Sequence, residues 1–363
     1  MTVRPEVSDL PAYSFTASDC PVKLDQNESP HDLPEGLKDE VVARLREIAF
    51  HRYPEMHADS LRAALARRHG WSERGVVVAN GSNVLIGALV QACGIGRRVV
   101  TVKPTFSIYP LQARLLGAAL TEVALAADFS LPLDALEAEL ASGQGVLFIA
   151  NPAAPTGNLL PAAELRALAA AARGWTVVID EAYAQFAGSD MSLLVRDYPH
   201  VASLRTMSKA FGLGGVRLGY MLAQPALAEE IQKVLLPFSV SALQVAVGLT
   251  VLGADDYVSA RVEETLLERA RVAAALAELG TELGLHVFPS HTNFLLFRVP
   301  DAAGFYGGLK ARGVLIRRQD GLHGLSGCLR VSVGTRAEND AFIAAARAVA
   351  ETYVVKAGEA QHV

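Results

Sequence analysis

The sequence predicts an α/β protein with a mostly parallel sheet in a large domain, followed by a smaller α+β domain. Between Gly75 and Thr206, apolar runs of strand length alternate with helical segments, which is the pattern of right-handed strand–helix–strand crossovers. Beyond Leu283 the pattern changes to short strands mixed with helices. The chain has 363 residues, more than one typical core holds, so two domains are expected. We expect an arm at residues 1–35 that packs with the small domain, a large domain at 36–260 and a small domain at 261–363.

The composition restricts the class of protein. Hydrophobic residues make up 51% and charged residues 20%, which is typical of a globular chain. A net charge of −5 without a basic stripe argues against a nucleic-acid partner. The uncharged run at 234–254 contains Pro237, and we interpret it as a loop leading into a buried helix, not as a membrane span. The N-terminus lacks the apolar core of a signal peptide, and the three cysteines lack metal-ligand spacing, so we expect reduced thiols in the cytoplasm.

The large domain begins with two helices and then alternates strands with helices. Helices are expected at 39–50 and 60–69, with Ser60 as the N-cap of the second. Strands are expected at 76–79, 98–102, 119–124, 145–150, 176–180 and 201–204. These segments are mainly apolar runs, which are typical of parallel strands covered on both faces. Four helices are expected between these strands: one ends at Cys93, one ends at Leu116, and two span 132–141 and 161–172.

The rest of the chain predicts the long helical connection and the smaller domain. Helices are expected at 225–235, 242–252 and 256–283. Short strands at 285–288, 293–298, 314–317 and 328–333 and helices at 302–312 and 337–354 complete the small α+β unit.

Lys209 is the centre of the predicted site. The hydroxyl residues Thr206 and Ser208 precede it, and Arg217 follows a glycine-rich turn. Such residues around a lysine without an acidic neighbour suit a bound phosphate whose attached carbonyl carbon the lysine attacks. The alternatives are a surface lysine before an ordinary glycine loop and, for Arg217, a surface ion pair.

Asp180 supplies the second part of the site. It ends the buried-type strand 176–180, where a carboxylate is costly to bury unless it is paired. An aspartate facing a protonated pyridine nitrogen removes that cost. A phosphate, an aldehyde and a pyridinium together describe pyridoxal 5'-phosphate.

Further candidates follow the ends of other strands. Gly81, Ser82 and Asn83 form a turn into a helix, where free backbone N–H groups favour an anion, although many such turns bind nothing. Phe106 follows the next strand and either packs in the core or stacks on a flat ring. Because ligands of parallel sheets lie beyond the carboxyl ends of the strands, these residues are expected to meet Asp180 and Ser208.

At this point the sequence resembles the fold-type I, class I/II aminotransferases that depend on pyridoxal phosphate, and within them the histidinol-phosphate aminotransferase group. The matching segments run in the family's order from the N-terminal part of the chain to its last strand. They are Leu24–Pro30, Arg52–Pro54, Gly81–Asn83, Pro104–Phe106, Pro155–Gly157, Asp180–Tyr183, Ser208–Phe211 and Leu329–Thr335.

The resemblance implies roles for residues near the cofactor. Lys209 is expected to bind the cofactor covalently and then to move a proton, while Asp180 keeps the ring nitrogen protonated. Tyr183 is expected to donate a hydrogen bond to the ring hydroxyl oxygen. Tyr53 precedes a proline and is held extended, so it either packs in its own loop or, as the resemblance implies, reaches the cofactor phosphate of a neighbouring subunit in a homodimer.

The resemblance also implies a substrate side. Arg330 lies within an apolar strand, where an arginine normally faces an anion, and it is expected to hold an α-carboxylate or the phosphate of histidinol phosphate. Arg317 follows the strand and is expected to be a second anion contact, while its neighbour Arg318 is expected to be solvated. Tyr13 and Asn27 match family positions on the substrate side, although ordinary packing or turn roles fit both equally well.

Two departures from the family pattern stand out. Ala154 replaces the usual asparagine before Pro-Thr-Gly, so a hydrogen bond to the ring oxygen, on the order of 1–3 kcal/mol, is lost. We therefore expect the absorbance of the bound cofactor to titrate at higher pH than in asparagine-containing relatives, unless Asn151 or Asn158 compensates. Val84 stands where relatives usually have glutamate.

The function expected from this resemblance is transamination of histidinol phosphate with 2-oxoglutarate in histidine biosynthesis. Two alternatives keep the cofactor: an aromatic amino acid aminotransferase and a threonine-phosphate decarboxylase. A third is a degenerate cofactor-binding protein without activity, which Ala154 and Val84 favour and Lys209, Asp180 and Arg217 oppose. No metal is expected in any of them.

Overall fold

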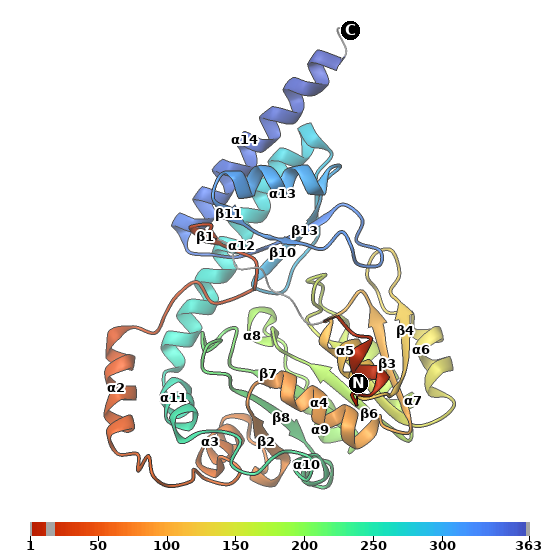
Figure 1. Cartoon of the computed structure of the whole chain (residues 1–363), viewed down its shortest axis with the longest axis vertical. Helices are drawn as coiled ribbons and strands as arrows, with labels where there is room; N and C mark the ends of the chain where they lie inside the picture. Colours follow the sequence, from red (N-terminus) through yellow and green to blue (C-terminus); the bar gives the residue numbers. More distant parts are fainter. Residues whose placement is uncertain (1, 12–18, 361–363) are drawn as a thin grey trace.

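A seven-stranded mixed sheet forms the centre of the larger part of the molecule (Figure 1). The computed structural model describes residues 2–11 and 19–360. Only β8 runs against its neighbours β2 and β7, so the sheet is mostly parallel, as predicted. In spatial order the strands are β2 (Val76–Ala79), β8 (Gly219–Ala223), β7 (Val201–Thr206), β6 (Trp175–Asp180), β5 (Gly145–Ala150), β3 (Arg98–Lys103) and β4 (Ala119–Ala124).

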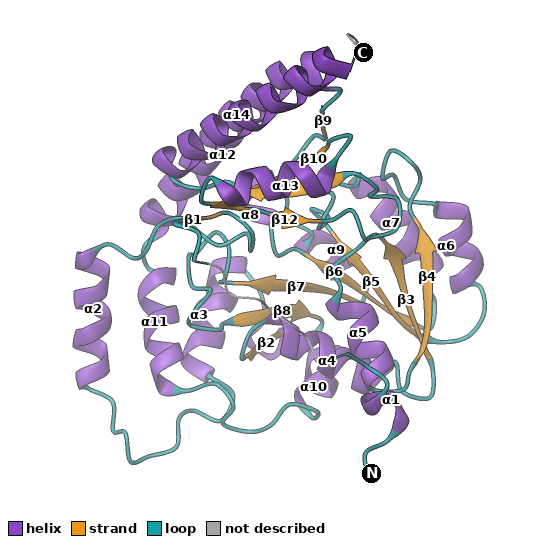
Figure 2. Cartoon of the chain, turned by 45° about the horizontal axis from the view of Figure 1, so that its top comes forward, coloured by secondary structure: helices purple, strands orange, loops and turns teal. Residues whose placement is uncertain are grey.

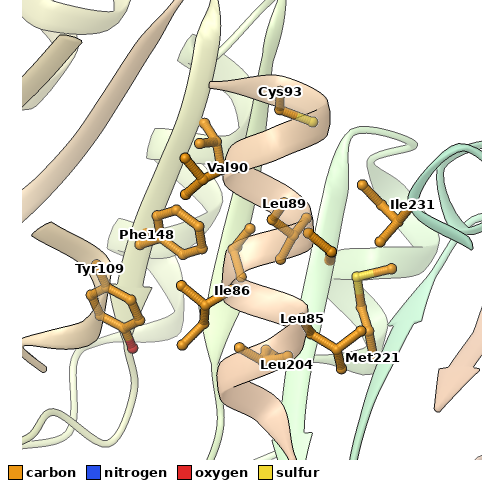
Figure 3. Close-up of a cluster of buried hydrophobic side chains, with 14 of the residues drawn as sticks. Leu85, Ile86, Leu89, Val90, Cys93, Tyr109, Phe148, Leu204, Met221 and Ile231 are labelled. Atoms are coloured by element: carbon orange, nitrogen blue, oxygen red, sulfur yellow. The ribbon is translucent and has the colours of Figure 1, made fainter. Parts of the chain in front are cut away.

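Helices cover both faces of this sheet because its strands are apolar on both sides. Along β5, Val146 and Phe148 enter one core cluster while Leu147 and Ile149 enter another. Figure 3 shows the first cluster, where α4 (Ser82–Cys93) packs Ile86 onto the sheet. The helices around the first cluster are α4, α5 (Ile108–Leu115) and α10 (Pro225–Gln232); those around the second are α6 (Leu133–Leu140), α7 (Ala162–Ala171) and α9 (Ser192–Asp197).

A four-stranded antiparallel sheet forms the smaller part. Its order is β12 (Arg317–Arg318), β13 (Cys328–Ser332), β10 (Phe294–Arg298) and β9 (His286–Val287). The helices α13 (Ala302–Ala311) and α14 (Arg336–Ala360) pack around it, and the 29-residue helix α12 (Asp255–Leu283) joins it to the larger part (Figures 1 and 2). The strand β1 (Val22–Lys23) pairs in parallel with β11 (Val314–Leu315). Residues Val22–Lys23 therefore contact the small part, whereas Pro5–Ser8 packs on α5 of the larger part and does not follow the predicted arm.

The remaining helices of the larger part are α2 (Glu35–Arg46), α3 (Asp59–His69), α8 (Ala184–Ala187) and α11 (Ala242–Leu252), together with the short α1 (Pro5–Ser8) and the 3-10 helix η1 (Glu73–Gly75). Helix α2 has no buried residue and stands at the edge of the molecule in both views (Figures 1 and 2). Within the described part of the chain, no helix is both long and apolar enough to cross a membrane.

The structure corrects several local predictions. Ser60 is not the N-cap of α3; Ala58 holds that position with φ 52°, and the Glu55 carboxylate accepts hydrogen bonds from Ser60 N and Oγ. The predicted strand 314–317 is two strands, β11 and β12, in different sheets. The strand β8 was not predicted, because its five residues follow directly on a glycine-rich turn. The proposed domain limits stay a prediction.

Candidate active site

A cavity of about 570 Å³ opens where the carboxyl ends of the parallel strands face the small sheet. Strand ends of the seven-stranded sheet supply one wall, and β12 and β13 supply Arg317 and Arg330 on the other. The structure brings together most of the predicted site residues here: Asn27, Ser82, Asn83, Phe106, Asp180, Tyr183, Thr206, Ser208, Lys209, Arg217, Arg317 and Arg330 line the cavity.

Lys209 follows β7 and reaches the centre of the cavity. Its Nζ donates a hydrogen bond to the Gln26 carbonyl oxygen at 3.1 Å and lies 6.0 Å from the centre of the Tyr183 ring. Burial, followed by the positive charge of Arg330, lowers the pKa of Lys209 to about 8. A large share of the amine is therefore neutral, and hence nucleophilic, near pH 8.

Asp180 lines the cavity, and each of its two carboxylate oxygens accepts one hydrogen bond. Its Oδ2 accepts a hydrogen bond from the Tyr109 hydroxyl at 2.6 Å, and its Oδ1 accepts one from Ala182 N at 3.1 Å. Burial raises the pKa of Asp180 to about 6, although these two donors oppose the shift. A cation beside Asp180 would relieve the cost of this buried carboxylate, as a protonated ring nitrogen does.

Tyr109 is a site residue that the sequence analysis missed. It is buried on α5, stacks on Phe148 with ring centres 5.0 Å apart and contacts Phe106 edge-on. Its position three residues after Phe106, in the first turn of the helix that follows, was the available signal. Burial and the adjacent Asp180 raise the pKa of Tyr109 well above its ordinary value, so its hydroxyl remains a donor.

An anion cradle forms where α4 begins. Gly81 has φ 82° and allows the turn, and no side chain caps the first N–H groups of the helix. Arg217 lies against this turn: a Cβ at Gly81 would come within 2.6 Å of its Nη2. The Arg217 guanidinium also contacts the Ser208 hydroxyl at 3.4 Å, and Thr206 Oγ1 accepts from Ser208 N. Helix terminus, hydroxyls and guanidinium together suit a phosphate.

The two arginines of the small sheet are direct cross-strand partners. Arg317 on β12 pairs in register with Arg330 on β13. Arg330 donates to the Asp25 carbonyl oxygen at 2.8 Å, and its guanidinium lies over the Phe294 ring. Like charges placed opposite each other are destabilising unless an anion joins them. Arg318 forms an ion pair with Asp320 and is about half exposed, but it also lines the cavity, so its solvated role stays a prediction.

Asn27 and Tyr183 lie side by side in the cavity wall. Asn27 Nδ2 donates to the Tyr183 hydroxyl oxygen at 3.0 Å, and its backbone N–H donates to Ser332 Oγ at 2.8 Å. Burial raises the pKa of Tyr183, so this phenol stays protonated. The side chain of Asn27 is therefore engaged by neighbours from both parts of the molecule.

Three predicted contributors need separate description. Tyr53 does not line the cavity of its own chain; it is 83% exposed and contacts Phe238, with the ring centres 5.0 Å apart and the ring planes tilted by 33°. Tyr13 lies outside the described residues. Ala154 does line the cavity, whereas Asn151 and Asn158 do not. Asn158 bonds Thr156 and the Phe129 carbonyl, and Asn151 Oδ1 accepts from Leu160 N. The Asn151 Nδ2 group is buried without a partner among the described residues, but Asn151 does not line the cavity.

These features fit pyridoxal 5'-phosphate. The cradle accommodates its phosphate, the lysine amine lies within the same cavity, and the buried carboxylate of Asp180 suits a protonated ring nitrogen. The fold and the cavity together define a pyridoxal-phosphate-dependent enzyme of fold type I.

Comparison with known proteins identifies the family. The family description "Aminotransferase class I and II" matches residues 21–345, and the chain belongs to this family. It is 49% identical to the histidinol-phosphate aminotransferase of Deinococcus radiodurans, over 94% of this chain and 95% of that protein. It is 40% identical to the enzyme of the same name from Thermococcus kodakarensis, over 94% and 97%. Its cofactor is pyridoxal 5'-phosphate.

The fold is shared with solved structures. The histidinol-phosphate aminotransferase of Sinorhizobium meliloti, solved in complex with pyridoxal-5'-phosphate, superposes with a TM-score of 0.85 at 26% identity, over 97% of this chain and 98% of that one. The L-threonine-O-3-phosphate decarboxylase of Porphyromonas gingivalis superposes with a TM-score of 0.77 at 23% identity, over 91% and 99%, and shows a common fold alone.

Proposed function

We propose that this aminotransferase transfers the amino group of histidinol phosphate to 2-oxoglutarate, giving imidazole acetol phosphate and glutamate. The observation that carries this proposal is the Arg317–Arg330 pair in the cavity wall. A phosphate monoester carries between one and two negative charges near neutral pH and three acceptor oxygens, so it can satisfy both guanidinium groups. Relatives at 49% and 40% identity carry the corresponding name.

We infer the following roles from the cavity. When bound, the cofactor supplies the carbonyl carbon that takes up the amino group and a ring that withdraws electrons from the substrate. Lys209 holds the cofactor and then carries a proton to and from the substrate Cα, for which a pKa of about 8 is well placed. Asp180 keeps the proton on the ring nitrogen. Tyr183 donates to the ring oxygen, and Phe106 stacks on the ring.

The phosphate of the cofactor is assigned to the cradle at α4. Ser82 and Asn83 offer backbone N–H groups, Thr206 and Ser208 offer hydroxyls, and Arg217 offers its charge. Substrate anions are assigned to Arg317 and Arg330 on the opposite wall. The two anion sites are thus separate, one on each sheet.

We infer that the enzyme works as a homodimer. Large apolar side chains are exposed on the two segments whose rings meet at Tyr53 and Phe238, namely Phe50 at 74% and Leu236 at 77% exposure, and no residue of α2 is fully buried within its own chain. Contiguous exposed apolar surface marks an interaction site. A second copy covering this surface would place Tyr53 in the partner's cavity, where its hydroxyl joins the cofactor phosphate. Because the cysteines form no disulfide, we also infer a cytoplasmic location.

The test is a half-reaction. Purified enzyme loaded with its cofactor is mixed with histidinol phosphate, and the absorbance change is compared with the changes given by glutamate, phenylalanine and threonine phosphate. We expect rapid conversion to the amine form with histidinol phosphate and glutamate, and slow conversion with phenylalanine. An unchanged spectrum with histidinol phosphate rejects the substrate, and release of carbon dioxide from threonine phosphate supports a decarboxylase instead.

A further inference from the structure

The amide of Asn27 connects the small sheet to the cavity. Its Oδ1 accepts a hydrogen bond from Ser332 Oγ at 3.2 Å, while its Nδ2 donates to the Tyr183 hydroxyl at 3.0 Å. Asn293 Nδ2 holds the Asn27 carbonyl oxygen at 3.0 Å. Ser332 ends β13 and Asn293 precedes β10, so both anchors belong to the small sheet. Asn27 itself is 2% exposed and adopts φ 53°, a conformation that asparagine tolerates.

The anchors fix which way round the amide sits. Ser332 Oγ already accepts from the backbone N–H of Asn27, so its own hydrogen needs an acceptor, and Asn27 Oδ1 is that acceptor. The NH₂ end must then face Tyr183. Since an amide NH₂ group can only donate, the Tyr183 oxygen accepts, and its hydroxyl hydrogen is left to donate into the cavity.

The direction in which the Tyr183 hydroxyl donates is more important in this chain because residue 154 is an alanine. A methyl group lines the cavity where relatives usually carry an asparagine, and neither Asn151 nor Asn158 lines the cavity. In this chain the hydrogen bond to the ring oxygen of the cofactor therefore depends on Tyr183. A Tyr183 hydroxyl turned toward Asn27 instead would leave that oxygen without either donor.

We propose that Asn27 is a positioning residue, which aims the Tyr183 hydroxyl at the ring oxygen of the cofactor and makes that aim depend on the placement of the small sheet through Ser332. The proposal rests on the role given above to Tyr183. It also links the Arg317–Arg330 anion site to the donor for the ring oxygen, because Ser332 lies two residues from Arg330 on the same strand. A substrate held by Arg330 thereby stabilises the strand that orients the donor.

The test measures the pH titration of the absorbance of the bound cofactor in the absence of any amino donor. Asn27→Gly removes the amide and tolerates the positive φ. Without an aimed donor the ring oxygen holds its negative charge less well, so the titration midpoint is expected to rise by about one pH unit. The charged and titratable groups that face Tyr183, namely Lys209, Arg330, Asp180 and Tyr109, are unchanged in this variant.

A double-mutant comparison separates positioning from general damage. Tyr183→Phe should raise the midpoint by at least as much, and Asn27→Gly combined with Tyr183→Phe should add nothing further, because both act through one hydroxyl. Ser332→Ala, which frees the amide without touching Tyr183, should give a smaller rise that also disappears in the Tyr183→Phe background. Ser29→Ala is the matched control from the same segment, since its hydroxyl bonds only locally to His31, and its midpoint should equal that of the wild type.

A wild-type midpoint in Asn27→Gly, or a shift that adds fully to that of Tyr183→Phe, overturns the proposal. Should Asn27→Gly fail to bind the cofactor, the comparison of Ser332→Ala with and without Tyr183→Phe decides in the same way. None of these titrations involves histidinol phosphate. A failed substrate assignment and a failed positioning role are therefore distinguishable.

Discussion

At the scale of single residues, Tyr109 shows how a neutral donor tunes the acid of the site. Its hydroxyl stabilises the ionised form of Asp180, whose pKa burial has raised to about 6. Tyr109→Phe should raise that pKa further, by about one unit for a hydrogen bond to a charged group. Because that pKa belongs to the cofactor-free protein, the acidic limb of the pH profile of cofactor binding should then move to higher pH, with most affinity regained on the alkaline side. A uniform loss at every pH would instead indicate a packing defect.

Asp180 itself should destabilise the cofactor-free protein at neutral pH. A carboxyl whose folded pKa is raised stabilises the fold below its unfolded pKa of 3.8, and that stability is lost as pH rises through about 6. Asp180→Asn removes the buried charge. Its free energy of unfolding without cofactor should exceed that of the wild type by about 2 to 3 kcal/mol near neutral pH.

Denaturant titrations of the cofactor-free proteins at several pH values measure this difference. The two curves should converge as the pH falls toward about 4, where both side chains are neutral. A difference that does not depend on pH contradicts the explanation. The same substitution should abolish most of the transamination activity, because the ring nitrogen loses its counter-ion.

At the scale of elements, the turn between β2 and α4 needs a backbone conformation with positive φ at Gly81, which favours glycine. Gly81→Ala places a methyl group in a left-handed conformation and against Arg217 Nη2. We expect the dissociation constant for the cofactor to rise at least tenfold, equivalent to about 1.4 kcal/mol. Gly36→Ala is the matched control, since a Cβ there meets nothing within 4 Å. Equal cofactor affinity in both variants, measured by equilibrium titration, would refute the cradle.

The sequence predicted the strands of the large sheet other than β8 well, because buried strands appear as continuous apolar runs. Val76–Ala79 and Gly145–Ala150 are strands with the predicted limits. Pairing is different: nothing in the run at 314–317 shows that Val314 joins β1 while Arg317 joins β13. Partner choice depends on contacts between distant segments, which periodicity does not encode.

The same distinction separates the site residues that were predicted from those that were not. Lys209 and Asp180 are recognisable because charge is unusual at the end of a buried strand. Tyr109 is not, since an aromatic residue on a helix normally indicates core packing, and only the fold reveals its hydroxyl 2.6 Å from Asp180. The hydrogen bond between Asn27 and Tyr183 joins residues 156 positions apart and was equally hidden.

At the scale of the whole molecule, the exposed position of Tyr53 predicts shared active sites. A subunit with Tyr53→Ala keeps its own Lys209, and a subunit with Lys209→Ala keeps its own Tyr53. Each homodimer should be impaired. In a two-fold symmetric dimer, a mixed pair contains one site with both residues intact, so exchange of subunits should restore about a quarter of wild-type activity.

Activity after mixing and exchanging the two purified variants provides the measurement. A control mixture of Tyr53→Ala with Asp180→Asn should recover activity to the same extent, since Asp180 belongs to the same side of the cavity as Lys209. No recovery in either mixture, despite verified subunit exchange, would show that Tyr53 serves only its own chain.

The division of the cavity between two sheets also affects how the substrate specificity of such an enzyme can change. The residues proposed to hold the cofactor phosphate and the two arginines proposed to hold the substrate, Arg317 and Arg330, belong to different sheets. Replacing the short segment around β12 should therefore change which amine is accepted, while the cofactor-binding residues of the seven-stranded sheet stay unchanged. For protein engineers, residues 317–322 are the natural starting point for a library.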